Sequence, residues 1–157
     1  FGIKMREELD KQLCEKYPLM FKDRHGDPMD TLMCWGFEHS DGWYQIINNL
    51  CDNIQHYIDW SHKSHAWDIK WNEEHADEPR PVREIVPQVV VDQVKEKFGT
   101  LRFYYQGGDD KIDGMVRMAE SMSAVMCEQC GAPATTRGPG WIRTLCDTHE
   151  EEYQKRR

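Results

Sequence analysis

Cys127-Glu128-Gln129-Cys130 and Cys146-Asp147-Thr148-His149 decide how the C-terminal part of this chain folds. Each motif places two metal-binding side chains on one short turn, so that both can point at the same atom. Three thiolates and one imidazole suit a tetrahedral Zn2+ ion. We therefore predict one zinc site made of Cys127, Cys130, Cys146 and His149. The alternative is that the cysteines are ordinary side chains of a small core.

The residues between and after the two motifs have the pattern of a small zinc finger. Arg137-Gly138-Pro139-Gly140 predicts a tight turn, and residues 141–145 predict a short strand that returns to the second ligand pair. Residues 147–153 carry acidic side chains where the first turn of a helix would lie. A ligand pair on a turn, a hairpin and a second pair at a helix start resemble a treble-clef zinc finger. We expect this subdomain over residues 127–157.

The predicted site leaves no coordination position open. Three thiolates, a neutral imidazole and Zn2+ sum to one negative charge, and the protein fills all four positions. Catalytic zinc sites usually keep one position for water. We therefore expect a structural zinc ion that folds about thirty C-terminal residues, which are too few to build a core of their own.

The charge of the chain is distributed unevenly. The chain has 157 residues, with 20 Lys and Arg against 28 Asp and Glu, so its net charge is −8. Residues 127–157 hold five basic and five acidic side chains, so the whole excess lies in residues 1–126. We expect those residues to form an acidic α+β body. Such a body repels phosphate backbones, which disfavours nucleic acid as a partner and favours a basic protein surface.

Nothing in the sequence indicates a membrane protein. Mean hydropathy is −0.81, and no apolar run approaches the roughly 20 residues of a membrane span. The charged start lacks a signal-peptide pattern, so we expect a cytoplasmic protein. Met5 resembles a natural first residue, which would make residues 1–4 an expression remnant. In a reducing compartment Cys14, Cys34 and Cys51 are expected to be buried free thiols.

Hydrophobic periodicity and turn residues predict the elements of the body. Helices are expected at residues 5–17, 43–60 and about 110–124, a short strand at 31–37, and a β-hairpin at 87–105. Pro18 ends the first helix, and Asp109 or Asp110 caps the third. The expected fold class is α+β: about three helices packed on a small antiparallel, hairpin-based sheet, with a treble-clef-like zinc subdomain at the C-terminus.

The second strand of the hairpin places Arg102 and Tyr104 on one face of the sheet, away from its apolar side chains. A cation beside an aromatic ring could bind a nucleotide or stack the bases of single-stranded nucleic acid. The alternative is that Arg102 forms a cross-strand salt bridge with Asp92 or Glu96.

Gly107-Gly108-Asp109-Asp110 follows this strand and opens the third helix. Glycine lets a ligand approach the backbone closely, and a helix N-terminus attracts anions. We therefore treat Arg102, Tyr104, Gly107, Gly108 and Asp109 as one candidate ligand site. The aspartates would repel phosphate, so the alternative is a plain turn and helix cap. A further alternative is a metal-dependent hydrolase, if another acid joins Asp109 and Asp110.

Residues 61–83 are rich in Trp, His and acidic side chains and end in two prolines. One interpretation is a mobile excursion whose Trp residues fold back onto the body. The other is a partner-binding arm, because an exposed Trp is costly without a partner. We therefore assign Trp60, Trp67 and Trp71 to a candidate partner surface. His62 and His65, with a nearby acid, could also form a second metal site.

No complete catalytic constellation is visible in the sequence. Cys34 with His39 and Ser40 with Asp41 are close along the chain, but the flanking residues match no known nucleophile motif. A treble-clef nuclease would need a catalytic His where Gly138-Pro139-Gly140-Trp141 stands. We therefore expect a non-enzymatic binding protein.

A resemblance covers most of the chain. It rests on Cys34-Trp35-Gly36-Phe37, on Asp41-Gly42-Trp43-Tyr44, on Val94-Lys95-Glu96-Lys97-Phe98-Gly99-Thr100-Leu101-Arg102-Phe103-Tyr104, on Gly107-Gly108-Asp109-Asp110 and on Cys127-Glu128-Gln129-Cys130-Gly131-Ala132-Pro133. With these motifs the chain resembles a group of small proteins of tailed phages and prophages to which no activity is assigned. The resemblance implies an accessory protein that acts in the host cytoplasm. A host-takeover or anti-defence factor that engages a host protein is the expectation.

Overall fold

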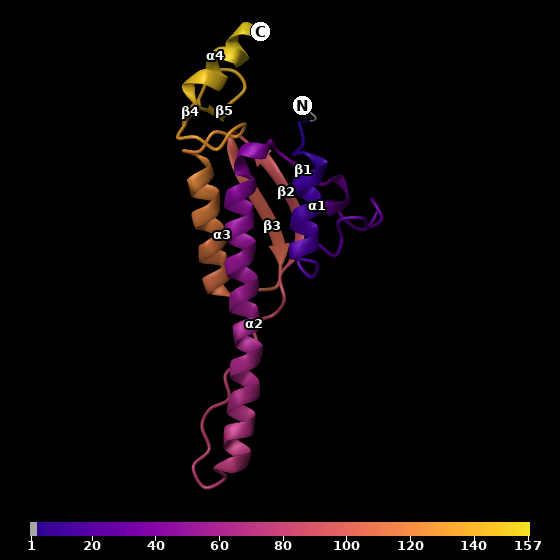
Figure 1. The fold of residues 1–157 in the computed structure, drawn as a ribbon, viewed down its shortest axis with the longest axis vertical. Helices are drawn as coiled ribbons and strands as arrows, with labels where there is room; N and C mark the ends of the chain where they lie inside the picture. Colours follow the sequence, from indigo (N-terminus) through magenta and orange to yellow (C-terminus); the bar gives the residue numbers. More distant parts are fainter. Residues whose placement is uncertain (1–2) are drawn as a thin grey trace.

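Three helices pack beside a three-stranded sheet in the computed structural model, which describes residues 3–157 (Figure 1). Of the predicted remnant 1–4, residues 1 and 2 lie outside the described part. The helices are α1 (Glu7–Lys16), α2 (Tyr44–Glu74) and α3 (Asp110–Ser123), and the strands are β1 (Phe37–Glu38), β2 (Val90–Lys97) and β3 (Thr100–Gln106). The predicted mixed α+β class is therefore confirmed. No helix within residues 3–157 is long and apolar enough to cross a membrane.

The C-terminal residues form a small unit of their own elements. They comprise β4 (Thr135–Arg137), β5 (Arg143–Leu145) and α4 (Asp147–Lys155). Strands β4 and β5 pair antiparallel, and Thr136 lies opposite Thr144. With α4, the described residues hold four α-helices instead of about three, because the acidic start of 147–153 continues as a helix.

The predicted hairpin forms, but the sheet is not purely antiparallel. Strands β2 and β3 pair antiparallel around a Phe98-Gly99 turn, where φ is 54° and 82°. Positive φ at both central residues is the turn geometry that matches the twist of a hairpin. Strand β1 then pairs parallel to β2, with Phe37 opposite Val94. Strand β1 corresponds to the short strand that was predicted at residues 31–37, but it begins only at Phe37.

The prediction of a strand at residues 31–37 is wrong because local hydrogen bonds bend this segment. The Thr31 hydroxyl accepts a hydrogen bond from the Met33 N–H at 3.0 Å. The chain then forms a short 3-10 helix, η1 (Met33–Trp35), which ends at Gly36 with φ of 80°. A second one, η2 (Asp41–Trp43), leads directly into α2. Side chains of Ser and Thr often compete with strand formation in this way.

The core lies between the sheet and α1, α2 and α3. Its α2 stripe is Ile47, Leu50, Cys51, Ile54 and Ile58, which share one buried cluster with Val91, Val94, Leu101 and Phe103 of the sheet. On α3 the buried residues are Ile112, Val116, Ala119 and Ser123, whereas Met122 is exposed. Cys51 is fully buried as predicted; Cys14 and Cys34 are half-buried.

The free edge of β3 is closed by side chains of α3. The Leu101 N–H donates to the Ser123 hydroxyl at 2.8 Å, and the Phe103 N–H donates to the Glu120 carboxylate at 2.9 Å. Unpaired N–H groups on an edge strand would otherwise invite another strand. These two groups are therefore unavailable for pairing with a partner strand.

Helix α2 extends well past the sheet, contrary to its predicted end at residue 60 (Figure 1). Its sequence contains no Gly or Pro between Trp43 and Glu78, so nothing in this stretch breaks the helix. The apolar stripe ends at Ile58, and Ser61, Ser64 and Asp68 take over as the buried positions. The chain then returns along this part of the helix. We call residues 60–86 the arm, and its returning part, 75–86, the strap.

Hydrogen bonds hold the strap to the helix. Asp68 accepts from the Arg83 side chain at 2.9 and 3.0 Å and from the Arg83 N–H at 2.8 Å. Asn72 exchanges two hydrogen bonds with the Arg80 backbone, at 2.8 and 2.9 Å. The Ser61 hydroxyl accepts from the Val86 N–H at 2.9 Å. Residues 61–83 are thus helix and strap, and the interpretation as a mobile excursion is wrong.

Lowering the pH should release the strap through Asp68. Hydrogen bonds from Arg83 lower the pKa of the Asp68 carboxyl to about 2, below its ordinary value of 3.8. Because the pKa is lower in the folded state, the bond stabilises the arm above about pH 4 and this contribution is lost as the pH falls towards 2. The Arg83 amide shift in NMR spectra should report this titration. In Asp68→Asn the titration should vanish, and hydrogen exchange at Arg83 should be faster already at neutral pH.

Asp59→Asn is the matched control, because Asp59 lies on α2 outside these contacts and accepts from Gln55. It should leave the Arg83 amide titration and exchange unchanged. An Arg83 amide that shows the same pH dependence in Asp68→Asn as in the wild type would contradict the assignment.

Candidate metal centre

The first ligand pair lies on a tight turn that follows α3. The Cys127 N–H donates to the Ala132 carbonyl at 2.7 Å, and the Gly131 N–H donates back to the Cys127 carbonyl at 2.8 Å. Gly131 has φ of 81°, a conformation that glycine adopts without strain. The turn therefore holds Cys127 and Cys130 on the same side of the chain.

The second ligand pair lies where β5 meets α4. Cys146 is the N-cap residue of α4, and its carbonyl accepts from the Glu150 N–H at 2.8 Å. His149 lies in the first turn of α4 and faces back towards Cys146. Arg143 and Glu150 fix the helix on the strand, with two hydrogen bonds of 2.7 and 2.8 Å. The prediction that this pair opens a helix is confirmed.

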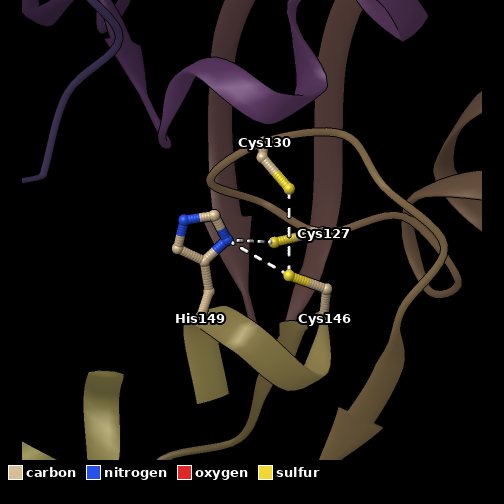
Figure 2. A group of neighbouring side chains, drawn as sticks. All are labelled: Cys127, Cys130, Cys146 and His149. Atoms are coloured by element: carbon tan, nitrogen blue, oxygen red, sulfur yellow. Dashed lines mark hydrogen bonds between the residues drawn. The ribbon is translucent and has the colours of Figure 1, made fainter. Parts of the chain in front are cut away.

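Figure 2 shows the four side chains pointing at a common centre. The His149 Nδ1 atom lies 3.2 Å from Cys146 Sγ and 3.6 Å from Cys127 Sγ, and Cys130 Sγ lies 3.8 Å from Cys146 Sγ. All four ligand atoms lie within 4.8 Å of one another. For metal–sulfur bonds of about 2.3 Å and metal–nitrogen bonds of about 2.0 Å, a tetrahedron has edges of roughly 3.5 to 3.8 Å. The cluster could therefore hold one metal ion.

The surroundings favour thiolate at the buried ligand. Burial alone would raise the pKa of the Cys127 thiol, but N–H donors of Cys146, Cys130 and Gln129 outweigh it and lower the pKa. A thiolate is the form that binds a metal. On the other side, His149 Nε2 lies 4.0 Å from the Glu152 carboxylate, as is common for the second nitrogen of a metal-bound imidazole.

The ligand turn is also joined to the body. The Gly42 N–H donates to the Glu128 carbonyl at 2.7 Å, and the Trp43 indole N–H donates to the Met126 carbonyl at 2.9 Å. A Cβ atom at Gly42 would overlap the carbonyl oxygens of Cys127 and Glu128, so the two backbones touch here. At the hairpin turn, the Thr144 hydroxyl donates to the Gly99 carbonyl at 2.6 Å.

Two buried residues of this junction, Glu128 and His39, were not predicted to belong to it. Glu128 is buried, and its carboxylate accepts from the Ser40 N–H at 3.0 Å. Burial raises its pKa, and the bond from Ser40 only partly offsets this effect. His39 is also fully buried, between the rings of Phe37 and Trp43. In the sequence, the only pattern around His39 was its closeness to Cys34.

In the second candidate site, the Gly-Gly loop packs against residues 87 and 88. Gly108 donates its N–H to Pro87 at 2.9 Å, and a Cβ atom at Gly107 would overlap the carbonyl of Gln88. Asp109 caps α3 by accepting from Lys111 and Ile112, and it accepts from the Tyr57 hydroxyl at 2.7 Å. The Gly-Gly loop therefore packs against the chain at residues 87 and 88, and Asp109 caps α3. This arrangement is the turn and helix cap of the alternative interpretation. Arg102 and Tyr104 lie further back on β3.

Metal ligation elsewhere finds no support in the described residues. Within residues 3–157, Asp109 and Asp110 belong to no group of three ligands as close as the Cys and His cluster. The same is true of His62 and His65, and the His65 ring nitrogen contacts the Arg83 carbonyl instead.

The predicted partner surface lies on the arm. Trp60 is 49% exposed and Trp67 is 50% exposed, whereas Trp71 is half-buried. The Arg80 guanidinium lies 4.0 Å from the centre of the Trp71 ring, and the His75 ring stacks on Trp71 at 3.9 Å. Trp71 therefore helps to hold the strap, and the other two rings remain accessible.

Comparisons with protein-family models, with curated proteins and with solved structures give no match to this chain.

Proposed function

We propose that the chain is a non-enzymatic binding protein, stabilised by one structural zinc ion, that engages a partner protein through its arm. The observation that carries this proposal is the arm itself. It projects beyond the sheet (Figure 1). Two of its Trp side chains, Trp60 and Trp67, are about half exposed. A segment that served only the core would bury these rings.

Zinc is the ion we propose for the cluster. Three sulfur ligands and one nitrogen ligand at tetrahedral spacing favour zinc over the hard cations, which prefer oxygen. Protein atoms fill all four positions, so the ion would stabilise residues 127–157 rather than activate water. We further propose a treble-clef arrangement, because the ligand turn, the β4–β5 hairpin and α4 follow one another in the order of that motif.

The arm has the composition of an interface. Trp is strongly enriched among residues that dominate binding energy. Around Trp60 and Trp67, further half-exposed apolar side chains lie on the arm: Ile69, Val82 and Ile85. The Arg83 guanidinium lies 5.5 Å from the centre of the Trp60 ring, and such a contact orients the ring.

The tip of the arm indicates the charge of the partner. Residues 73–78 hold four acidic side chains and no Lys or Arg, and all of them are exposed. Opposite charge across an interface accelerates association and selects the partner. We therefore propose a partner with a basic surface. Because the chain resembles phage proteins, we propose that this partner is a host protein in the bacterial cytoplasm and that the chain is a host-takeover or anti-defence factor.

Trp60→Ala combined with Trp67→Ala should strongly weaken capture of the partner. Both rings are half-exposed, so their truncation should cost little folding stability but remove the apolar centre of the interface. The measurement is affinity capture from bacterial host lysate, followed by titration of the captured protein. Binding should weaken by about a hundredfold, as expected for loss of two interface anchors. Metal content and melting temperature should stay at the wild-type values.

Trp35→Ala is the matched control, because Trp35 is also half-exposed but lies far along the chain in η1. It should leave binding unchanged. Equal loss of binding in both variants, or unfolding of the double variant, would refute the arm as the interface. Failure of the wild-type protein to capture any protein reproducibly would refute the proposed function.

A further inference from the structure

The sheet face that points away from the core carries two cations side by side. Lys95 on β2 lies directly opposite Arg102 on β3. Their neighbours Val94 and Phe103 are buried in the core, so the alternation of a strand places Lys95 and Arg102 on the outer face. Like charges at directly opposite positions destabilise a sheet.

Neither cation has an acidic partner among residues 3–157. The Nε atom of Arg102 is buried and makes no hydrogen bond. The predicted salt bridge from Arg102 to Asp92 or Glu96 is therefore wrong: Asp92 accepts from Gln106, and Glu96 accepts from the Gly99 N–H. In a chain with net charge −8, two adjacent cations that form no salt bridge stand out.

An aromatic ring lies next to this pair. Tyr104 is 42% exposed, and its register partner on β2 is Gln93. Positions two apart on a strand share a face and lie about 7 Å from one another. Tyr104 therefore lies on the same face as Arg102, two positions along β3. Glu38 stands across from Lys95 on β1, but its carboxylate accepts from Gln93.

We propose that this face binds single-stranded nucleic acid, with a phosphate between Lys95 and Arg102 and a base stacked on Tyr104. A phosphate would neutralise the repulsion between Lys95 and Arg102. An aromatic ring beside cations on an open face is the usual arrangement for single strands. This site is separate from the arm and does not depend on the proposed function.

Two other ligands fit the face less well. Duplex DNA requires a broad basic surface, which an acidic chain with two unpaired cations does not provide. A peptide that adds a strand needs a free sheet edge, but Ser123 and Glu120 already bind the N–H groups of Leu101 and Phe103.

The test is fluorescence anisotropy of a labelled oligothymidylate at low salt with the full-length, metal-loaded protein. Arg102→Gln should weaken binding about tenfold or more, and Tyr104→Ala should weaken it to a similar extent, as expected for loss of a phosphate contact or a stacked base. Lys63→Gln is the charge-matched control, because Lys63 is exposed on the arm. It should leave the affinity within about twofold of the wild-type value.

The same variants separate a ligand site from a structural role. Arg102→Gln removes an unbonded buried donor, so its melting temperature should equal or exceed that of the wild type; a clear decrease would assign Arg102 to stability. No binding by the wild type, or equal binding by Arg102→Gln, overturns the proposal. Tighter binding of thymidine monophosphate than of the oligonucleotide would also overturn it, in favour of a mononucleotide. Loss of binding in the double variant Arg156→Gln with Arg157→Gln would place the binding site at the C-terminus and overturn the proposal.

Discussion

Cys146→Ser should remove the metal and unfold residues 127–157. Protein purified without added metal should contain about one zinc ion per chain by elemental analysis, since the four ligands define one site. Structural zinc contributes up to about 10–16 kcal/mol to the folding of small zinc domains. Among residues 127–157 only Cys127 and Leu145 are buried apolar residues, so this unit has little core that could replace the metal. We expect the melting temperature to fall by about 10 °C or more, given 2–4 °C per kcal/mol for a chain of this size.

Cys34→Ser is the matched control for the same chemical change. The Cys34 thiol is half-buried and donates to the Thr31 carbonyl at 3.1 Å, a bond that a serine hydroxyl can also make. This variant should keep its zinc and lose little stability. A wild-type protein that lacks metal, or a Cys146→Ser variant that melts like Cys34→Ser, would refute the structural zinc ion.

Local sequence patterns correctly predicted the elements that interactions between neighbouring residues stabilise. The Asp109 cap, the helix that follows it and the Phe98-Gly99 turn each depend on residues within one or two turns of each other. The convergence of the four metal ligands also follows from spacing along the chain. In these cases neighbouring residues carry the physical cause.

The prediction errors arise where residues far apart in the sequence determine the local structure. Helix α2 was expected to end with its apolar stripe, but Ser61 and Asp68 continue it because the strap, more than ten residues further on, supplies their hydrogen-bond partners. The parallel pairing of β1 with β2 joins residues 37 and 94, and no local signal specifies it. Arg102 was given two plausible acids, yet Asp92 accepts from Gln106 and Glu96 accepts from the Gly99 N–H.

Trp43→Ala should be the most destabilising substitution in the body, with a loss of about 3–5 kcal/mol. Trp43 is fully buried, and its ring lies beside His39 where η2 enters α2. Trp43→Phe keeps most of the apolar volume but leaves the Met126 carbonyl without its donor, so it should cost about 1–3 kcal/mol. Urea unfolding followed by circular dichroism measures both values. Trp35→Ala, at a half-exposed ring, should cost less than about 0.5 kcal/mol.

The same series tests whether the C-terminal unit and the body unfold together. The indole N–H of Trp43 binds the residue directly before Cys127, and the neighbouring Gly42 binds Glu128. If these contacts couple the two parts, Trp43→Phe should loosen the ligand turn and accelerate transfer of zinc to a chelator, whereas Trp35→Ala should not. Unchanged zinc transfer in a clearly destabilised Trp43→Phe would contradict the coupling. Residues 127–157 would then fold around their metal independently of the sheet, because the zinc ligands alone would hold the turn in place.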